Sequence, residues 1–316
     1  MTASSSSTSD PGVLGRSATA LRPGRRAASR RRREVVSAYL FLAPGFVLFA
    51  AVILYPILRA FQISLYQWSL VPGTASKWLG LHNYDRALHD PLFWRGLENA
   101  AFYMALTVPA QIVIGMAVAI LLDAKMPGRG FFRAVYYLPV VTSWVVVSLL
   151  FRYLFITEGG FVNSELHLNV NWLGERWTAM LVLAILGVWK GIGWSMVIFL
   201  GALQSVPAEL KEAAAVDGAG PWARFRAVSL PAMRPVIAFV TILLVIGGFN
   251  VFISVYLITQ GGPLQETQVL LTYMYQQAFS YLDFGYGSAL AFILTLIVFV
   301  LALLQLRLFR RPSEAA

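Results

Sequence analysis

Two polar side chains lie in long apolar stretches, where each would be costly without a partner. Lys190 lies about twelve residues into the apolar stretch 178–203, a depth of roughly 18 Å at the rise of an α-helix. Asn250 follows the glycine pair Gly247-Gly248, where a kink is predicted, inside the apolar stretch 236–258. A buried ammonium or amide group needs a polar cavity or a backbone partner. These residues therefore predict either contacts with a polar ligand or structural contacts: backbone or water for Lys190, and a neighbouring helix for Asn250.

Side chains that could form a catalytic or metal site are scarce and scattered. The 316 residues include no cysteine, and the three histidines, His82, His89 and His167, fall in polar loops. All fifteen acidic residues fall in tails, loops or the ends of apolar stretches, so no acidic ion relay is predicted inside a membrane. No lysine follows a glycine, which excludes the phosphate-binding pattern G-x-x-x-x-G-K-[ST]. We therefore expect no enzyme activity and no bound cofactor or metal, and any energy for moving a solute would come from another protein.

The elements that carry these residues are predicted to be membrane-spanning helices. The chain is 58% hydrophobic and only 13% charged, with a mean hydropathy of +0.67, values typical of a polytopic membrane protein. A helix needs roughly 20 apolar residues to cross the hydrocarbon core. The sequence therefore predicts an all-α protein with six transmembrane helices near residues 36–60, 98–122, 132–156, 178–203, 236–258 and 287–309.

The basic residues predict the orientation of these helices. The net charge is +10, and eight arginines fall within the first 34 residues. Eighteen of the twenty-five Lys and Arg residues lie in or beside segments on the same side as the N-terminus. The positive-inside rule therefore places both termini and the polar segment 205–235 in the cytosol, which explains the charge better than nucleic-acid binding does. We expect a disordered basic tail over residues 1–34 and a transmembrane domain over residues 35–312.

The polar segment 205–235 is predicted to fold into a compact pair of short helices. Asp217-Gly218 supplies a turn, and Pro221 opens a second helix that Leu230-Pro231 ends. The small residues of the segment would let another protein approach the backbone closely, as in helix-in-groove recognition. The alternative is an amphipathic helix on the bilayer surface, which the lysine and arginines of the segment would suit.

The amino-acid sequence of this segment resembles that of permease subunits in bacterial ABC sugar importers. The resemblance to the EAA loop of these permeases rests on Glu212, Ala213, Ala214, Asp217, Gly218, Ala219, Phe225, Leu230 and Pro231. Further similar motifs are Gly80-Leu81-x-Asn83-Tyr84, Tyr136-Tyr137-Leu138-Pro139, Gly201-Ala202-Leu203-Gln204-Ser205-Val206-Pro207, Thr259-x-Gly261-Gly262-Pro263 and Tyr286-Gly287-Ser288-Ala289-Leu290. Together these motifs cover about residues 36 to 310, and they are most similar to the branch that handles maltose, other oligosaccharides and glycerol 3-phosphate.

This resemblance implies a type I importer fold, with a core at about residues 94–308. Segment 205–235 would couple the permease to a dimer of ATP-binding subunits, and those subunits would hold ATP and Mg. The other expected partners are a second homologous permease subunit and an extracytoplasmic solute-binding protein. The expected function is the passage of a di- or oligosaccharide through the bacterial inner membrane. The alternative is a non-sugar solute such as glycerol 3-phosphate.

The resemblance also implies a substrate path between the fourth and fifth predicted helices. Matched onto this chain, the contact positions of the family fall near Gly187, Gly191, Gly248 and Val251. Glycine and valine at such places depart from the polar residues of maltose permeases, so the contacts are expected to differ. The depth and helical face of Lys190, Trp194 and Asn250 add them to the predicted path. We expect Trp194 to stack on a sugar and Asn250 to form a hydrogen bond with it.

Two loops predicted on the opposite side from segment 205–235 carry aromatic anchors together with turn residues. They cover residues 78–84 and 259–263. Such loops are typical of an interfacial aromatic belt, and alternatively of a docking surface for an extracytoplasmic partner. A membrane-embedded enzyme would need a catalytic cluster, and a channel would need no segment that docks an ATPase. A subunit of a transporter accounts for the sequence better than either.

Overall fold

The structure of the chain is a computed structural model that describes residues 25–71, 73–124 and 127–309. The chain divides into two units, residues 1–58 and 59–316. In the first unit, α1 (Arg25–Phe49) continues through the π-helical turn η1 (Ala50–Leu54) into α2 (Tyr55–Ser64), whose last residues belong to the second unit. The stretch Val36–Ser64 is long and apolar enough to cross a membrane, as the sequence predicts for residues 36–60.

Helix α1 begins earlier than the predicted boundary between tail and membrane domain. Residues from Arg25 to Glu34 are helical, where a disordered tail was expected. Alanine and arginine are good helix formers, so the apolar helix extends back through the basic run. Residues 1–24 of the predicted tail lie outside the described residues, as do residues 310–312 at the end of the predicted transmembrane domain.

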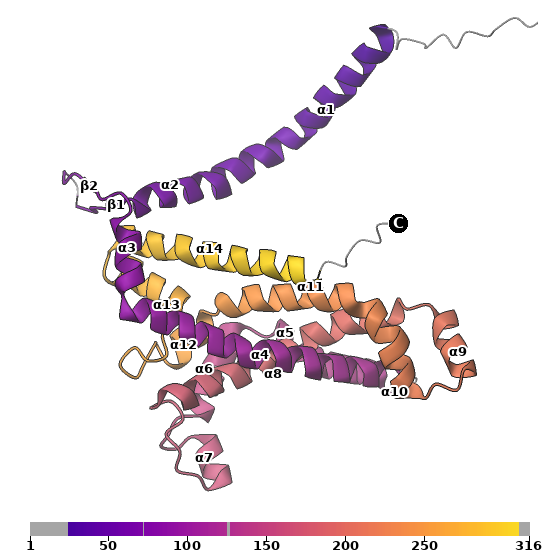
Figure 1. Cartoon of the computed structure of the whole chain (residues 1–316). Helices are drawn as coiled ribbons and strands as arrows, with labels where there is room; N and C mark the ends of the chain where they lie inside the picture. Colours follow the sequence, from indigo (N-terminus) through magenta and orange to yellow (C-terminus); the bar gives the residue numbers. More distant parts are fainter. Residues whose placement is uncertain (1–24, 72, 125–126, 310–316) are drawn as a thin grey trace, which may run out of the picture. The chain divides into compact units, whose positions relative to one another are not determined.

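Four long helices form the bundle of the second unit (Figure 1). They are α4 (Pro91–Asp123), α8 (Arg176–Gln204), α11 (Leu230–Phe249) and α14 (Phe284–Phe309). Helix α4 packs along α8 and α11, and α11 also packs against α14. Small residues bring α4 and α8 close together, because a Cβ atom added at Gly115 would lie 2.8 Å from the Cβ atom of Ser195. Close packing at small residues is how helices associate where water cannot drive them together.

Two of the predicted spans are broken helices. The span expected at 132–156 consists of α5 (Arg129–Val141) and α6 (Trp144–Leu154), which bend by 91° at the break. The span expected at 236–258 consists of α11 and α12 (Ile253–Ile258), separated by residues 250–252. Among the described residues, five helical stretches could cross a membrane on their own, and the bent α5–α6 pair would make a sixth. Over the residues that the structure describes, the fold is therefore predominantly helical, with five or six candidate spans.

Short elements gather at the two ends of the bundle (Figure 1). The α3 end carries an antiparallel strand pair, in which Tyr66 lies opposite Trp78, together with α3 and α13. The α9 end carries α9 and α10. The bounds of the short elements are β1 (Tyr66–Gln67), β2 (Lys77–Trp78), α3 (His82–His89), α7 (Phe161–Leu166), α9 (Ala208–Val216), α10 (Pro221–Arg224), η2 (Phe225–Ser229), α13 (Leu270–Tyr275) and η3 (Gln276–Ser280).

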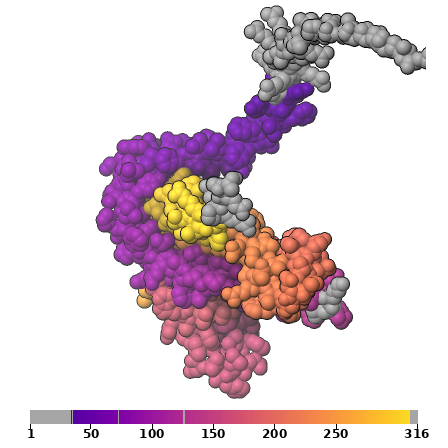
Figure 2. Space-filling view, turned by 45° about the vertical axis from the view of Figure 1, so that its right-hand side comes forward, coloured from indigo at the N-terminus to yellow at the C-terminus, as the bar shows by residue number. Residues whose placement is uncertain are grey.

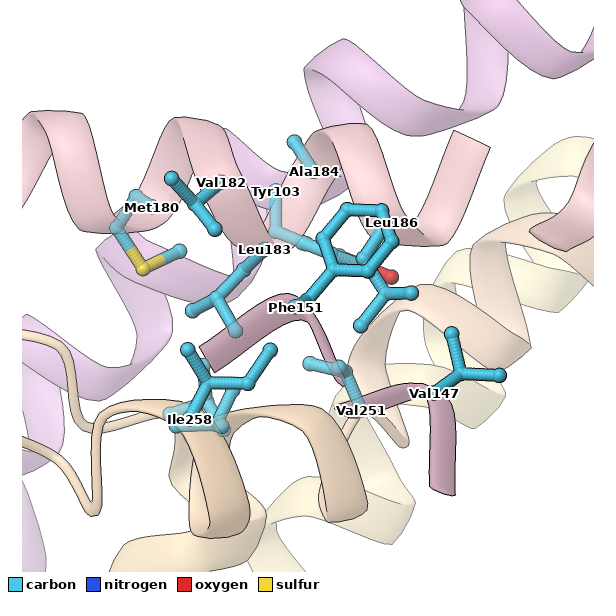
Figure 3. Close-up of a cluster of buried hydrophobic side chains, with 12 residues drawn as sticks. Tyr103, Val147, Phe151, Met180, Val182, Leu183, Ala184, Leu186, Val251 and Ile258 are labelled. Atoms are coloured by element: carbon cyan, nitrogen blue, oxygen red, sulfur yellow. The ribbon is translucent and has the colours of Figure 1, made fainter. Parts of the chain in front are cut away.

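A buried apolar cluster holds the two short half-helices α6 and α12 against α8. Its side chains come from α4, α6, α8, α12 and the α11–α12 break (Figure 3). Burial of such side chains is worth about 1.5–3 kcal/mol each against water. The labelled members are Tyr103, Val147, Phe151, Met180, Val182, Leu183, Ala184, Leu186, Val251 and Ile258. The cluster fixes both helix breaks beside the middle of α8.

Candidate functional site

A cavity of about 670 Å³ lies between α4, α8, α11 and the two helix breaks. Its polar lining consists of hydroxyl and amide side chains: Tyr103, Thr107, Gln111, Asn250 and Ser254. Its aromatic lining also includes Trp144, Phe252 and Tyr275. Glycines and aliphatic side chains complete the wall. A pocket with apolar walls and a few polar groups is typical of a binding site for a small organic ligand.

Glycines on α8 make room for the polar groups of α4. A Cβ atom at Gly187 would overlap the hydroxyl group of Tyr103, and one at Gly191 would overlap the amide group of Gln111. On the facing helix, a Cβ atom at Gly248 would lie 3.3 Å from the Cβ atom of Met104. These glycines therefore let tyrosine and glutamine side chains lie across α8 at the edge of the cavity.

Asn250 ends α11 and lines the cavity. Its backbone N–H donates to the carbonyl oxygens of Ile246 and Gly247, at 3.2 and 3.1 Å. Its side-chain Nδ2 also donates to the Ile246 carbonyl oxygen, at 2.8 Å. The sequence predicts a kink at Gly247-Gly248, but α11 continues through both glycines and breaks at Asn250 instead. At this break the asparagine satisfies the carbonyls of Ile246 and Gly247 in the last turn of the helix. Its Oδ1 has no hydrogen bond among the described residues and can accept one from a ligand.

Lys190 caps the end of α5 from α8. Its side chain is only 4% exposed, and its Nζ donates to the carbonyl oxygens of Pro139, Val140 and Thr142 at 2.7, 3.3 and 2.7 Å. These carbonyls come from the last residues of α5 and the link to α6, where intrahelical partners are missing. Of the two roles that the sequence left open, the structure has the backbone contact, and Lys190 is not among the residues that line the cavity.

The structure brings together five of the seven path residues expected from the sequence. Those that line the cavity are Gly187, Gly191, Gly248, Asn250 and Val251. Trp194 packs instead against a second apolar cluster that includes Met116, Phe199 and Met233. It shares a helical face with Gly187 and Gly191, but it lies further along α8 and is not among the residues that line the cavity.

Several lining residues were not expected from the sequence. Trp144 begins α6, directly after the break at Thr142-Ser143, and a serine before an apolar run is an N-cap signal that could have located this break. Thr107 and Gln111 lie four residues apart on one face of α4, a polar stripe in an apolar span. Tyr275 lies at the end of α13, and no sequence signal connects it to the other lining residues.

The segment resembling the EAA loop forms an exposed structure at the α9 end. Gly218 has a φ of +81°, which glycine adopts readily and other residues do not. The N–H of Ala219 donates to the Ala214 carbonyl oxygen at 3.0 Å, and that of Gly218 to the Ala215 carbonyl oxygen at 3.1 Å. These two bonds form a Schellman motif that ends α9. In Figure 2 this segment lies at the right-hand side of the molecule, in the salmon and orange colours of the bar.

The nine expected residues of this segment differ in exposure. Glu212, Ala213, Asp217 and Gly218 are exposed, while Ala214, Ala219, Phe225, Leu230 and Pro231 are partly buried. Lys211 donates from Nζ to the Leu203 carbonyl oxygen at 2.9 Å, so it ties α9 to the end of α8. Trp222 and Phe225 stack with their ring centroids 5.5 Å apart. The segment therefore packs on itself and on the bundle.

The helix that opens at Pro221 does not end at Leu230-Pro231, so this prediction is wrong. It continues through η2 into α11. Pro231 lies in the first turn of α11, directly after the π-helical turn, where a residue without an N–H is tolerated. The turn at Asp217-Gly218 and the helix start at Pro221 are as predicted.

Polar side chains order the α3 end. The Nδ2 of Asn99 donates to the carbonyl oxygens of Glu266 and Gln268, at 2.8 and 2.7 Å. Arg176 pairs with Glu98 at 2.6 Å, and Arg95 pairs with Glu266. Residues 266–268, which follow the predicted outer loop 259–263, are therefore bound to α4, and Thr267 in turn donates to the Thr259 hydroxyl and the Gly262 carbonyl oxygen of that loop.

Asp90 links α3, α4, α13 and α14 at this end. Its Oδ2 accepts hydrogen bonds from the hydroxyls of Tyr273 and Tyr286 at 2.5 and 2.6 Å, and its Oδ1 accepts one from the Leu92 N–H at 2.9 Å. Burial raises the pKa of Asp90, but these hydrogen bonds and the charge of Arg86 outweigh burial. The pKa of the carboxyl group therefore lies below its ordinary value.

Asp90→Asn is expected to destabilise the protein by on the order of 1–3 kcal/mol, because one amide oxygen cannot replace two carboxylate oxygens. Since the folded state lowers the pKa, the contribution of the carboxylate is present above its ordinary pKa of about 3.9 and is lost as the pH falls through the folded value. Thermal unfolding of the detergent-solubilised protein checks this. The midpoint of the wild type should fall below about pH 4, more steeply than that of the variant.

Asp85→Asn is the matched control, because the Asp85 side chain is 66% exposed and its one ion-pair partner among the described residues is His89. It should leave the unfolding midpoint and its pH dependence unchanged, since exposed ion pairs contribute little. Equal midpoints for Asp90→Asn and Asp85→Asn would contradict the structural role given to Asp90.

Helices that could span a membrane, a cavity between them and an exposed segment at one end define a subunit of a membrane transporter. Comparisons identify its family: the family model described as "Binding-protein-dependent transport system inner membrane component" matches residues 111–314. The chain belongs to this family. It is a transport subunit of the inner membrane rather than an enzyme.

Named relatives and a solved structure agree with this family. The lactose transport system permease protein LacF of Rhizobium radiobacter is 34% identical over 287 residues, covering 88% of this chain and 95% of its own. The arabinooligosaccharides transport system permease protein AraP of Bacillus subtilis is 34% identical over 277 residues, which cover 85% of this chain and 87% of AraP. The fold is shared with a chain from the crystal structure of a bacterial ABC transporter involved in the import of the acidic polysaccharide alginate. The TM-score is 0.80 at 21% identity, and the match covers 92% of this chain and 100% of that chain.

Proposed function

We propose that this permease forms part of the path of a neutral di- or oligosaccharide through the inner membrane. An external binding protein would deliver the sugar, and a separate ATP-binding dimer would supply the energy. The observation that carries the proposal is the cavity beside the two helix breaks, with its aromatic rings and uncharged polar groups. Relatives named for lactose and for arabinooligosaccharides support a saccharide.

The lining suits the two chemical faces of a sugar. Saccharides present C–H groups, which pack on aromatic rings, and hydroxyl groups, which need hydrogen-bond partners. Trp144 of α6 and Tyr275 of α13 offer aromatic rings, and the Oδ1 of Asn250 offers an acceptor. A site that hydrogen-bonds hydroxyls discriminates strongly against ligands that lack them, because its own polar groups would be left unpaired.

A glycerol 3-phosphate path is the alternative, and the described lining does not favour it. A phosphate group at this depth needs a cation or several N–H donors to offset its desolvation. The lining residues in the described ranges are uncharged at neutral pH. The ammonium group of Lys190 lies nearby, but its three N–H donors are directed to three backbone carbonyls. A neutral ligand avoids this cost.

The remaining partners follow from the two ends of the bundle. We assign the α9 end to the cytosol, where the basic residues gather, and expect the ATP-binding dimer there. The folded α3 end would then face the external binding protein, and both termini would be cytosolic. The bent α5–α6 pair would be the third of six spans. The exposed apolar side chains along Val36–Ser64 would face lipid or a second homologous permease subunit.

Asn250→Ala is expected to lower uptake roughly tenfold or more, because it removes the acceptor and one cap of α11. The test begins with the complex purified with its external binding protein, whose bound ligand is identified by mass spectrometry. A neutral saccharide is expected. The labelled ligand is then used for uptake into vesicles, alongside measurement of basal ATP hydrolysis, which should stay close to that of the wild type.

Thr241→Val is the matched control on the same helix. Thr241 also makes a hydrogen bond to a carbonyl four residues earlier, at 2.7 Å, but it does not line the cavity. Normal uptake by Asn250→Ala would place the path elsewhere. A phosphate ester held by the binding protein would overturn the saccharide and favour the alternative.

A further inference from the structure

Lys190 contacts both sides of the break between α5 and α6. On the α5 side its ammonium group donates to the carbonyl oxygens of Pro139 and Val140, and in the link it donates to that of Thr142. On the α6 side its Nζ lies 4.9 Å from the ring centroid of Trp144, a cation–π distance. One buried side chain of α8 therefore holds the end of one helix and the first residue of the next.

The charge of Lys190 is matched by what surrounds it. The C-terminal end of a helix carries partial negative charge on its unpaired carbonyls, which favours a cation. An ammonium group has three N–H donors, and three carbonyl oxygens lie within hydrogen-bond distance. No donor remains for a ligand. A role for Lys190 in recognition must therefore act through a neighbour.

That neighbour is Trp144, which lines the cavity, whereas Lys190 does not. The Trp144 side chain is 38% exposed and lines the cavity. The α5–α6 bend of 91° lies directly before this residue. The direction of α6 decides where the indole ring points. Because the Lys190 contacts fix the carbonyls on one side of the bend and the ring on the other, they fix the ring relative to α8.

We propose that Lys190 is a positioning residue that holds Trp144 at the cavity wall, and that the Trp144 ring is a platform on which a sugar ring of the transported saccharide stacks. This inference rests on the proposed function. It replaces the stacking role expected for Trp194, which packs away from the cavity. Asn250 on the opposite helix break supplies the hydrogen bond, so the two breaks together bind the two faces of the ligand.

The test uses a single cysteine as a reporter of ligand binding. The chain has no cysteine of its own, and Gly247 lines the cavity with open space around an added Cβ atom. The Gly247→Cys chain is purified in complex with its partner permease and ATP-binding subunits. Labelling of this chain by a small methanethiosulfonate reagent is followed by mass spectrometry. The probes are lactose, maltotriose and arabinotriose, and the quantity measured is the concentration that halves the labelling rate.

Four variants in this background separate the two roles. Trp144→Leu is expected to raise the half-protecting concentration by roughly threefold to tenfold, the range of an aromatic stacking contact. Trp144→Phe keeps a ring and should raise it less. Lys190→Met should raise the half-protecting concentration as much as Trp144→Leu does. In the double variant Lys190→Met/Trp144→Leu the half-protecting concentration should be no higher than in the more affected single variant, because both changes remove the same contact. Lys190→Gln replaces Lys190→Met if the latter complex does not assemble.

The outcomes are distinguishable. If the effects of Lys190→Met and Trp144→Leu multiply in the double variant, Lys190 acts independently of Trp144 and the positioning role is overturned. If Trp144→Leu leaves protection unchanged, the platform is overturned while the saccharide path stands. If no saccharide protects the Gly247→Cys reference itself, the proposed function fails, and this inference fails with it.

Discussion

Ala214→Trp is expected to abolish substrate-stimulated ATP hydrolysis and uptake, while the subunits still assemble and the external binding protein still docks. Ala214 is partly buried on α9, in the segment that resembles the EAA loop. If this segment lies in a groove of an ATP-binding subunit, an indole ring in place of a methyl group prevents it from entering. Gly218→Val should act similarly, because a φ of +81° costs a branched residue about 1–2 kcal/mol and unfolds the end of α9.

The measurement is stimulated ATP hydrolysis in reconstituted vesicles, with subunit stoichiometry determined on the same preparation. Ala208→Trp, at the exposed opposite end of α9, is the control and should retain most of the stimulation. A cysteine at Ala219 should react with an impermeant reagent in inverted vesicles but not in intact cells. Full stimulation with Ala214→Trp would show that this segment does not couple the subunits, and a helix on the bilayer surface would explain it better.

Gly193→Ala is expected to disrupt the packing of α5 on α8. An added Cβ atom would overlap the carbonyl oxygen of Tyr136 and would lie 2.9 Å from its carbonyl carbon and 3.0 Å from the Cα atom of Tyr137. These are backbone atoms, which cannot rotate away, so the two helices must separate. Overpacking of this kind typically costs about 1–3 kcal/mol. The thermal midpoint of the purified protein should fall, and the Lys190 contacts on the same helix should be lost with it.

Gly201→Ala is the matched control on α8, because a Cβ atom there meets nothing within 4 Å. Alanine is a better helix former than glycine, so this change should leave stability unchanged or raise it by up to about 1 kcal/mol. Equal midpoints for the two variants, measured by size-exclusion chromatography after heating, would mean that α5 and α8 are further apart than the structure has them.

Local signals predicted the turns better than the helix ends. Gly218 was expected in a turn because glycine adopts positive φ values, and Pro221 was expected to open a helix because proline suits a first turn. The same residue type misled at Pro231, where the sequence does not show that a π-helical turn precedes it. Asn250 lies at the end of its helix and donates from its side chain to the carbonyl oxygen of Ile246, a feature that the glycine pair before it obscured.

The cavity could be predicted only in part, because its lining comes from helices far apart in the sequence. Gly191 was expected from the resemblance, but the reason for a glycine there is Gln111, which lies on α4. Lys190 was singled out by its depth, yet its partners lie about fifty residues earlier, at a break that hydropathy alone reads as a continuous span. The contacts of these residues join segments that are distant in the sequence, so local sequence patterns could not predict them.

The continuity of α10, η2 and α11 has a mechanical consequence. This helical run extends from Pro221 to Phe249, a length of about 40 Å at the helical rise. Trp222 lies exposed at one end, and Gly248 forms part of the cavity wall at the other. A protein that binds at the Pro221 end and a ligand that binds in the cavity would therefore act on the same continuous helical run. Each should change how firmly the other is held, since coupling between two binding events is reciprocal.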